Sequence, residues 1–137
     1  MLIPIPILII DDEIDLSLLL KQFLNKIGFD AVSFTNSRLA FDHLKHNHNK
    51  YSLIITDFKM PEISGLQLAT KIRNEINSKV KIFLITAFDI SDLDNVLEFQ
   101  TAKIDRIIQK PIKLLALKKI INQTLQQIPK IIDKETQ

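Results

Sequence analysis

The sequence contains no cysteine, no tryptophan and only two glycines among its 137 residues. The absence of cysteine excludes disulfides, thiol catalysis and zinc–thiolate sites, and it is compatible with a reducing cytoplasm, where we expect the protein. The chain also lacks an internal repeat, a low-complexity tract and a Gly/Ser-rich linker. Its length and these absences predict a single domain over residues 1–128, followed by a polar tail over residues 129–137.

An excess of charge of one sign is also missing, because 18 Lys and Arg oppose 16 Asp and Glu. No basic run carries interleaved aromatic residues, so we predict no direct contact with nucleic acid. The apolar start, MLIPIPILII, has no basic segment before it, contains two prolines and reaches Asp11 before it could span a bilayer. We therefore predict no targeting segment and no membrane contact, and we interpret residues 5–10 as a buried strand.

Short apolar runs alternate with longer amphipathic stretches along the chain, which is typical of βαβ units around a parallel sheet. Strands are predicted at 5–10, 31–35, 53–56, 80–86 and 104–108. Helices are predicted at 12–27, from 37 into the forties, at 65–76, at about 90–100 and at 112–127. Gly28 should end the first helix, since glycine is free to adopt a positive φ. The predicted fold class is α/β: a flavodoxin-like (βα)5 three-layer sandwich with a parallel five-stranded sheet of order 2-1-3-4-5.

Polar residues stand where the predicted strands end. ILIIDDE places Asp11 and Asp12 directly after the first strand, LIITD ends in Asp57, the fourth strand ends on Thr86, and the fifth is followed by Lys110. The carboxyl ends of parallel strands meet at one edge, where open α/β sheets bind ligands. In the order 2-1-3-4-5 the first and third strands are neighbours, so the three carboxylates should converge.

Three crowded carboxylates repel one another, so either one of them holds a proton or a cation lies among them. Oxygen ligands without His or Cys favour a hard ion, here Mg²⁺ (or Mn²⁺), which leaves coordination positions for phosphate oxygens. Lys110 and Thr86 would add a positive charge and a hydroxyl donor. This set of residues indicates a site for a phosphoryl group bound close to a metal ion.

Two plainer interpretations of the polar residues stay open. An Asp after a strand is often the N-cap of the next helix, and Asp11 and Asp12 could cap the first helix together with Glu13. All three histidines lie in DHLKHNHNK, where His43 and His46 are one helical turn apart and could form a surface metal site. No carboxylate pattern or second ligand pair supports that site, so we interpret the segment as a solvated helix end and loop.

The motifs IIDDE, TDFKMPEISGLQL, LITA and QKP occur in this order and at intervals that resemble those of response-regulator receiver domains, in particular the single-domain chemotaxis regulators. The resemblance covers about residues 5–127. It implies a phosphoacceptor signalling switch of a two-component phosphorelay. Such a switch takes a phosphoryl group from a sensor histidine kinase or phosphotransfer protein in a Mg²⁺-dependent reaction and then changes its protein contacts. The resemblance also implies that the protein is not an enzyme beyond self-phosphotransfer and autodephosphorylation.

The resemblance assigns the acceptor and the metal ligands. Asp57 would be the phosphoacceptor, whose carboxylate attacks the phosphorus of a phosphohistidine. Asp12 would bind the metal directly and Asp11 partly through water. Asp57 and the backbone carbonyl of Lys59 would complete the protein ligands.

The resemblance also assigns the residues that bind the phosphoryl group. The Thr86 hydroxyl would hydrogen-bond a phosphoryl oxygen and report its presence. The N–H of Ala87 would donate to the same group, beside Lys59, and the ammonium of Lys110 would form an ion pair with it. The peptide bond between Lys110 and Pro111 is expected to be cis.

The sequence departs from the family at several positions. The family's switch usually pairs the Thr with an aromatic residue three positions before the Lys, so the switch positions here are Thr86 and Ile107, and the aromatic ring is missing. Lys103 stands where a Gly is usual, so this turn is expected to differ. Lys59 and Phe88 occupy positions that often tune dephosphorylation. A bulky Phe88 would hinder an in-line water, and we expect slow self-dephosphorylation.

No DNA-binding or enzymatic output domain is recognisable within these residues, so we expect the output to be a contact with a downstream protein or a phosphate relay, unless the sequence is part of a longer regulator. A phosphorylation-dependent dimer through the fourth and fifth helices and the fifth strand is one such contact. The first alternative is a pseudo-receiver that binds partners without phosphate, which Ile107 suggests and the intact acids oppose. The second is an aspartate-nucleophile phosphatase, but Asp11 and Asp12 are adjacent, unlike the DxD of those enzymes.

Overall fold

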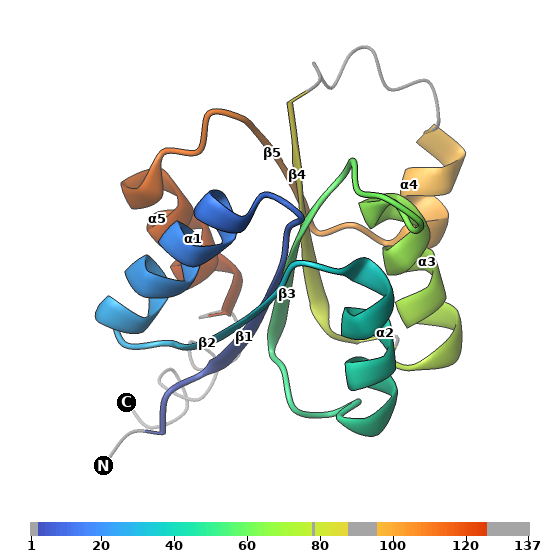
Figure 1. Cartoon of the computed structure of the whole chain (residues 1–137), viewed down its shortest axis with the longest axis horizontal. Helices are drawn as coiled ribbons and strands as arrows, with labels where there is room; N and C mark the ends of the chain where they lie inside the picture. Colours follow the sequence, from blue (N-terminus) through green and yellow to red (C-terminus); the bar gives the residue numbers. More distant parts are fainter. Residues whose placement is uncertain (1–2, 78, 88–95, 126–137) are drawn as a thin grey trace, which may run out of the picture.

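Strands and helices alternate along the chain as the apolar pattern predicts (Figure 1). The structure is a computed structural model that describes residues 3–77, 79–87 and 96–125. The elements are β1 (Pro6–Ile10), α1 (Ile14–Lys26), β2 (Asp30–Phe34), α2 (Ser37–His46), β3 (Leu53–Asp57), α3 (Gly65–Glu75), β4 (Lys81–Thr86), α4 (Val96–Ala102), β5 (Arg106–Gln109) and α5 (Leu114–Leu125). The first part of the helix predicted at 90–100 and the predicted tail, 129–137, lie outside the described residues.

The strands form one parallel five-stranded sheet in the order β2-β1-β3-β4-β5, which confirms the predicted fold class and strand order. Figure 1 shows α1 and α5 on one face of this sheet and α2, α3 and α4 on the other, so the domain has three layers. Ile10 lies opposite Thr56 in the register, and Asp57 lies opposite Ile85. The residues that follow β1, end β3 and end β4 therefore meet at one edge.

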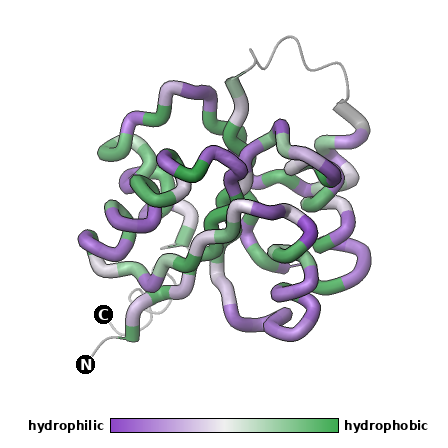
Figure 2. The backbone as a smooth tube through the Cα atoms, in the orientation of Figure 1, coloured by the Kyte–Doolittle hydropathy of each residue, from purple (hydrophilic) through white to green (hydrophobic). Residues whose placement is uncertain are grey.

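Successive residues of the central strands pack on opposite faces of the sheet. Ile7 and Ile9 belong to a buried cluster with side chains of α1 and α5. Leu8 and Ile10 belong to a second cluster with side chains of α2 and α3. Burial on both faces explains why these strands read as continuous apolar runs. Figure 2 shows the same pattern, with hydrophobic residues concentrated in the strands between the helical layers.

No helix among the described residues is long and apolar enough to cross a membrane.

Helix α3 begins in a capping box, where the Ser64 hydroxyl accepts from the N–H of Gln67 at 3.1 Å and the Gln67 side chain accepts from the N–H of Ser64 at 3.0 Å. This cap fixes the start of α3, which directly follows the loop after Asp57. The cap therefore helps to hold Gly65 against the end of β3.

Arg73 joins α3 to the segment that leads into β5. Its side chain is only 5% exposed. The guanidinium donates to the carbonyl oxygens of Val80, Ala102 (3.1 Å) and Lys103 (2.8 Å) and to a carboxylate oxygen of Asp105 (3.3 Å). Burial lowers the pKa of Arg73 despite the charge of Asp105 and the hydrogen bond to it. We call this set of bonds the Arg73 clamp.

Left-handed backbone follows two of the helices. Gly28 has a φ of 104° after α1, as predicted. Lys103, where the family usually has Gly, has a φ of 51° after α4, and its N–H donates to the carbonyl of Gln100 at 3.2 Å. A residue with a Cβ rarely adopts this conformation. The departure from Gly therefore leaves a lysine in a conformation that glycine would adopt without steric cost.

The histidine segment corrects one interpretation. His43 is half-buried, its Nε2 lies 2.7 Å from the Tyr51 hydroxyl, and its ring centroid lies 4.8 Å from that of Phe34. Burial, together with the charge of Lys50, lowers the pKa of His43. The description as a solvated helix end is therefore wrong for His43, because the side chain belongs to a cluster of rings. The imagined metal site loses this ligand, since the ring already bonds to Tyr51.

Candidate functional site

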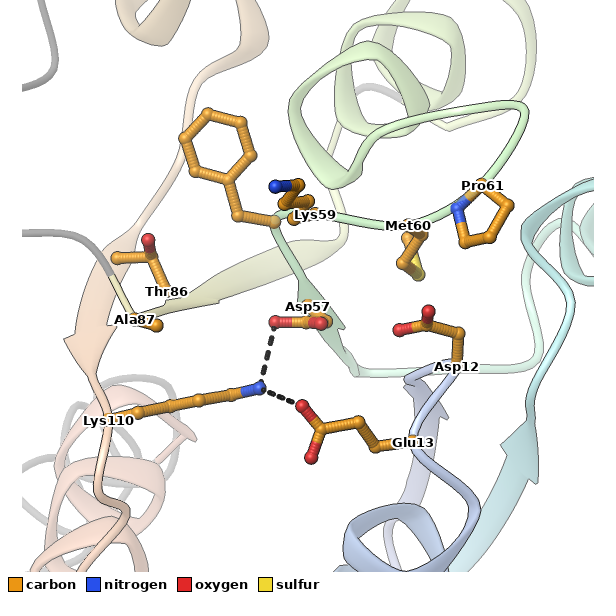
Figure 3. Close-up of a pocket in the computed structure, with 10 residues that line it drawn as sticks. Asp12, Glu13, Asp57, Lys59, Met60, Pro61, Thr86, Ala87 and Lys110 are labelled. Atoms are coloured by element: carbon orange, nitrogen blue, oxygen red, sulfur yellow. Dashed lines mark hydrogen bonds and ion pairs between the residues drawn. The ribbon is translucent and has the colours of Figure 1, made fainter.

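A cavity of about 590 Å³ opens at the carboxyl edge of the sheet (Figure 3). Its lining contains the predicted site residues Asp12, Asp57, Lys59, Thr86, Ala87 and Lys110, together with Glu13, Phe58, Met60 and Pro61. Asp11 is 1% exposed and belongs to the same carboxylate group as Asp12 and Asp57. The structure thus brings together residues that lie up to a hundred positions apart in the chain.

Main-chain hydrogen bonds hold the ends of the strands around this cavity. The N–H of Asp11 donates to the carbonyl of Phe34 at 3.1 Å, so the loop after β1 is tied to β2. The N–H of Phe58 donates to the carbonyl of Ile85 at 2.7 Å, which continues the pairing of β3 with β4. Asp57 itself is the last residue of β3, between two neighbouring strands. The position of its carboxylate is therefore set by the sheet and not by a mobile loop.

The first residue of α3 packs directly on the backbone of Asp57. The N–H of Gly65 donates to the carbonyl of Phe58 at 2.6 Å. A Cβ at position 65 would lie 2.1 Å from the carbonyl oxygen of Asp57 and 2.8 Å from Cδ1 of Leu84. Any larger residue at position 65 would therefore force α3 or the end of β3 to move.

Three carboxylates converge in the site. Asp11, Asp12 and Asp57 each offer a carboxylate oxygen, and these atoms lie within 4.8 Å of one another. Oδ1 of Asp11 accepts from the N–H of Glu13 at 2.9 Å, whereas Oδ2 is buried and has no hydrogen-bond partner among the described residues. A buried oxygen without a donor beside two further acids fits a bound cation. Neither Asp11 nor Asp12 caps α1, whose N-cap residue is Glu13.

The ammonium of Lys110 lies between two carboxylates, as Figure 3 shows. Its Nζ is 3.3 Å from Oδ1 of Asp57 and 3.2 Å from Oε1 of Glu13. The peptide bond to Pro111 is cis. Burial alone would lower the pKa of Lys110, but the bonds to Glu13 and Asp57 and the charges of Asp57 and Asp11 outweigh burial and raise it. Lys110 therefore carries its charge inside the cavity.

The role of Glu13 is absent from the sequence interpretation, which treated this residue only as a helix cap. The third acid in DDE was the available signal. Its bond to a lysine 97 positions away could not be read from local spacing. The side chain of Glu13 is 61% exposed at the rim, whereas that of Asp57 is 7% exposed.

Burial raises the pKa of both acids that are most enclosed. For Asp11 desolvation is the largest cause, the N–H of Glu13 opposes it, and the pKa reaches about 6. For Asp57 desolvation also raises the pKa, while the nearby ammonium of Lys110 opposes the shift. Burial thus makes the ionised form of both carboxylates less favourable than it is in water, and the charge of Asp57 adds a smaller contribution at Asp11.

The raised pKa of Asp11 predicts an unusual pH dependence of stability. The folded chain binds this proton near pH 6, whereas the unfolded chain binds it only near the ordinary value of 3.8. In a chelator, lowering the pH from about 7.5 to about 5 should therefore raise the Asp11 contribution to the free energy of unfolding by about 1 kcal/mol. Urea titrations at each pH measure the free energy of unfolding.

The matched variant for this experiment is Asp11→Asn, which has the same shape and no titration. His43 has a lowered pKa and acts in the opposite direction, so the difference between the two proteins isolates Asp11. An identical pH dependence in both proteins would contradict the prediction.

The remaining predicted residues differ in their position relative to the cavity. Thr86 is buried at the end of β4, and Ala87 is exposed directly after it. Lys59 is exposed in the loop after β3. Ile107 is half-buried on β5 opposite Leu84 and is not one of the residues that line the cavity. Phe88, which was expected to slow self-dephosphorylation by hindering an in-line water, lies outside the described residues.

Comparison with known proteins identifies the family. A family model for the response regulator receiver domain matches residues 7–122. Response regulator RppA of Synechocystis is 31% identical over 111 residues, which cover 81% of this chain and 46% of that protein. The chain thus spans less than half the length of this relative.

Two solved structures have a similar overall fold. A receiver domain protein from Clostridium thermocellum is 25% identical with a TM-score of 0.80, covering 93% of this chain and 98% of that one. TrrA from Thermotoga maritima, solved in complex with Mg²⁺-BeF, is 31% identical with a TM-score of 0.72, covering 87% and 97%. Given the family model, the strand order and the cluster of acids at the sheet edge, the chain belongs to the response regulator receiver domain family.

Proposed function

We propose that this domain accepts a phosphoryl group on Asp57 and thereby acts as a signalling switch. The observation that carries the proposal is the arrangement at the end of β3. Asp57 lies within 4.8 Å of the oxygens of two other acids and 3.3 Å from the ammonium of Lys110, in an open cavity. A sensor histidine kinase or a phosphotransfer protein would supply the phosphoryl group, as the family membership suggests.

Mg²⁺ (or Mn²⁺) would be held by Asp11, Asp12, Asp57 and the backbone carbonyl of Lys59. The donor set contains only oxygen atoms, which suits a hard divalent cation. The buried Oδ2 of Asp11 has no other partner among the described residues. TrrA, one of the similar structures, was solved in complex with Mg²⁺-BeF, which supports the proposal that this domain binds Mg²⁺. When bound, the ion would offset the crowding of the acids and polarise the phosphoryl oxygens.

In the proposed reaction a carboxylate oxygen of Asp57 attacks the phosphorus of a phosphohistidine. The new P–O bond forms as the P–N bond breaks, and the electron pair of that bond leaves with the imidazole nitrogen of the donor. Lys110 would stabilise the charge on the phosphoryl oxygens, while the Thr86 hydroxyl and the Ala87 N–H would donate to them. Rigid placement of these groups by strand ends keeps the reorganisation needed during transfer small.

The phosphorylated domain would bind its partner, a downstream protein or a second copy of the chain, through the face formed by α4, β5 and α5. The support is structural continuity, because Thr86 pairs with Gln109 of β5 and accepts from the N–H of Lys110 at 2.7 Å. Phe58, next to the acceptor, also packs edge-on against Phe99 of α4 with centroids 6.4 Å apart. Ile107 offers neither a ring nor a hydroxyl.

The proposal is tested by replacing the acceptor. The wild-type protein, incubated with Mg²⁺ and acetyl phosphate, should gain the mass of one phosphoryl group in intact-mass spectrometry. Asp57→Asn should abolish this gain, because the amide lacks the nucleophilic oxygen charge while it keeps the shape of the side chain.

The control variant is Asp42→Asn, which removes an acid whose side chain is 58% exposed on α2 and which should label like the wild type. Absence of labelling from any donor would instead favour a pseudo-receiver that binds partners without phosphate. Labelling that persists in Asp57→Asn would place the acceptor elsewhere.

A further inference from the structure

We propose that Glu13 is a specificity-determining residue of the phosphoacceptor site, which shares Lys110 with Asp57 and disfavours phosphoryl donors of high negative charge. This inference rests on the proposed function and deepens it, since it concerns which donors the site accepts. Glu13 has no role in the assignments above, and its carboxylate is outside the group formed by Asp11, Asp12 and Asp57.

The geometry places the Glu13 carboxylate where a donor must approach. Glu13 lines the cavity, and its side chain is 61% exposed at the rim. The Lys110 ammonium bridges it to the acceptor, with one contact of 3.2 Å to Glu13 and one of 3.3 Å to Asp57. Figure 3 shows the two carboxylates on either side of the Lys110 ammonium. An ammonium has three donors, so Lys110 can keep both contacts and still bind a phosphoryl oxygen.

The charge of Glu13 changes the electrostatic potential that an incoming donor meets at Lys110. The Lys110 ammonium directly contacts Asp57, and Glu13 contacts the same ammonium and so offsets part of the positive potential that it offers. A donor that enters the cavity is attracted by Lys110 and repelled by Glu13 at a similar range. The repulsion scales with the charge of the donor, so a dianion loses more than a monoanion does.

Positioning of Lys110 by Glu13 is the competing explanation, and it makes a different prediction. The ammonium is also held by Asp57, and its side chain is only 18% exposed, so the site does not depend on Glu13 to orient it. A positioning role would change the rate by the same factor for every donor. A charge role changes the ratio between donors.

The experiment compares Glu13→Gln with the wild type on two small donors, acetyl phosphate, which is a dianion, and phosphoramidate, which is a monoanion. The amide can still accept from Lys110, so only the charge is removed. With free Mg²⁺ held constant, the second-order rate constant of labelling should rise about three- to tenfold for acetyl phosphate and by about the square root of that factor for phosphoramidate. The difference should shrink at high salt.

Asp15→Asn is the matched control, because it removes one negative charge from an exposed residue in the first turn of α1, two positions after Glu13 and outside the cavity lining. It should leave the ratio between donors unchanged. Glu13→Ala removes both charge and contact, and it should give the same ratio as Glu13→Gln whatever it does to the absolute rates.

The outcomes separate this inference from the proposed function. Equal factors for the two donors, slower labelling of Glu13→Gln with both, or the same change in Asp15→Asn would overturn the role of Glu13 and leave Asp57 as the acceptor. A wild-type protein that neither donor labels would overturn the proposed function and this inference with it.

Discussion

Replacing Arg73 with alanine should lower the free energy of unfolding by about 3 kcal/mol, because it removes every bond of the Arg73 clamp at once. The carbonyls of Val80 and Ala102 would lose a charged donor in a part-buried position. Asp105 would retain Lys81 at 3.7 Å and the N–H of Ile82 at 2.8 Å, so the loss falls mainly on the carbonyls. Urea unfolding measures the change, and the melting temperature should fall by roughly 10 °C.

Arg73→Lys should recover little of this stability, because a single ammonium cannot reach acceptors that surround a planar guanidinium. Lys71→Ala is the matched control on the same helix, since it removes a cation whose side chain is 42% exposed and should cost less than about 1 kcal/mol. Phosphorylation of Arg73→Ala well below its melting temperature should stay within about twofold of the wild type. A stability loss equal to that of Lys71→Ala would contradict the clamp.

In contrast to Arg73→Ala, Gly65→Ala should slow phosphorylation strongly and lower the stability of the fold only moderately. The new methyl group would lie 2.1 Å from the carbonyl oxygen of Asp57, so α3 or the end of β3 must move by about 1 Å. Overpacking of this kind costs about 1–3 kcal/mol of stability. A displacement of about 1 Å at the acceptor should slow labelling by acetyl phosphate about 100-fold.

Gly28→Ala provides the comparison for Gly65→Ala. A Cβ at Gly28 would meet nothing within 4 Å, but the residue has a φ of 104°. This variant should therefore lose about 1 kcal/mol through backbone strain alone and label at the wild-type rate. Equal labelling rates in the two glycine variants would show that Gly65 does not position the acceptor.

The parts of the fold that could be predicted are those set by local pattern and topology. β3 is buried along its whole length, and its first three residues, Leu53, Ile54 and Ile55, form an apolar run without polar alternation, which predicts a central strand. Once the strands are parallel, the position of a residue at a strand end follows from strand order alone. Asp57 and Thr86 could therefore be placed at one edge without any knowledge of side-chain conformations.

The parts that could not be predicted depend on side chains that cross between elements. The Glu13–Lys110 pair joins two loops 97 positions apart. Arg73 lies beside the buried Ile72 on α3, and nothing in the helical periodicity indicates that it bonds to carbonyls far along the chain. His43 was misjudged because its partner, Tyr51, comes from beyond the end of its helix. Periodicity reports the side of an element that a residue faces, not the partner it meets there.

The edge position of β5 makes local opening of the sheet uneven. β5 has four residues and exposes both of its ends, and among the described residues it pairs with β4 alone, whereas β3 is buried throughout and has a neighbour on each side. Backbone amides of β5 should therefore exchange with solvent through small local openings, while those of β3 wait for global unfolding. The acceptor thus lies on a strand that should open late, and the face proposed for output includes a strand that should open earlier.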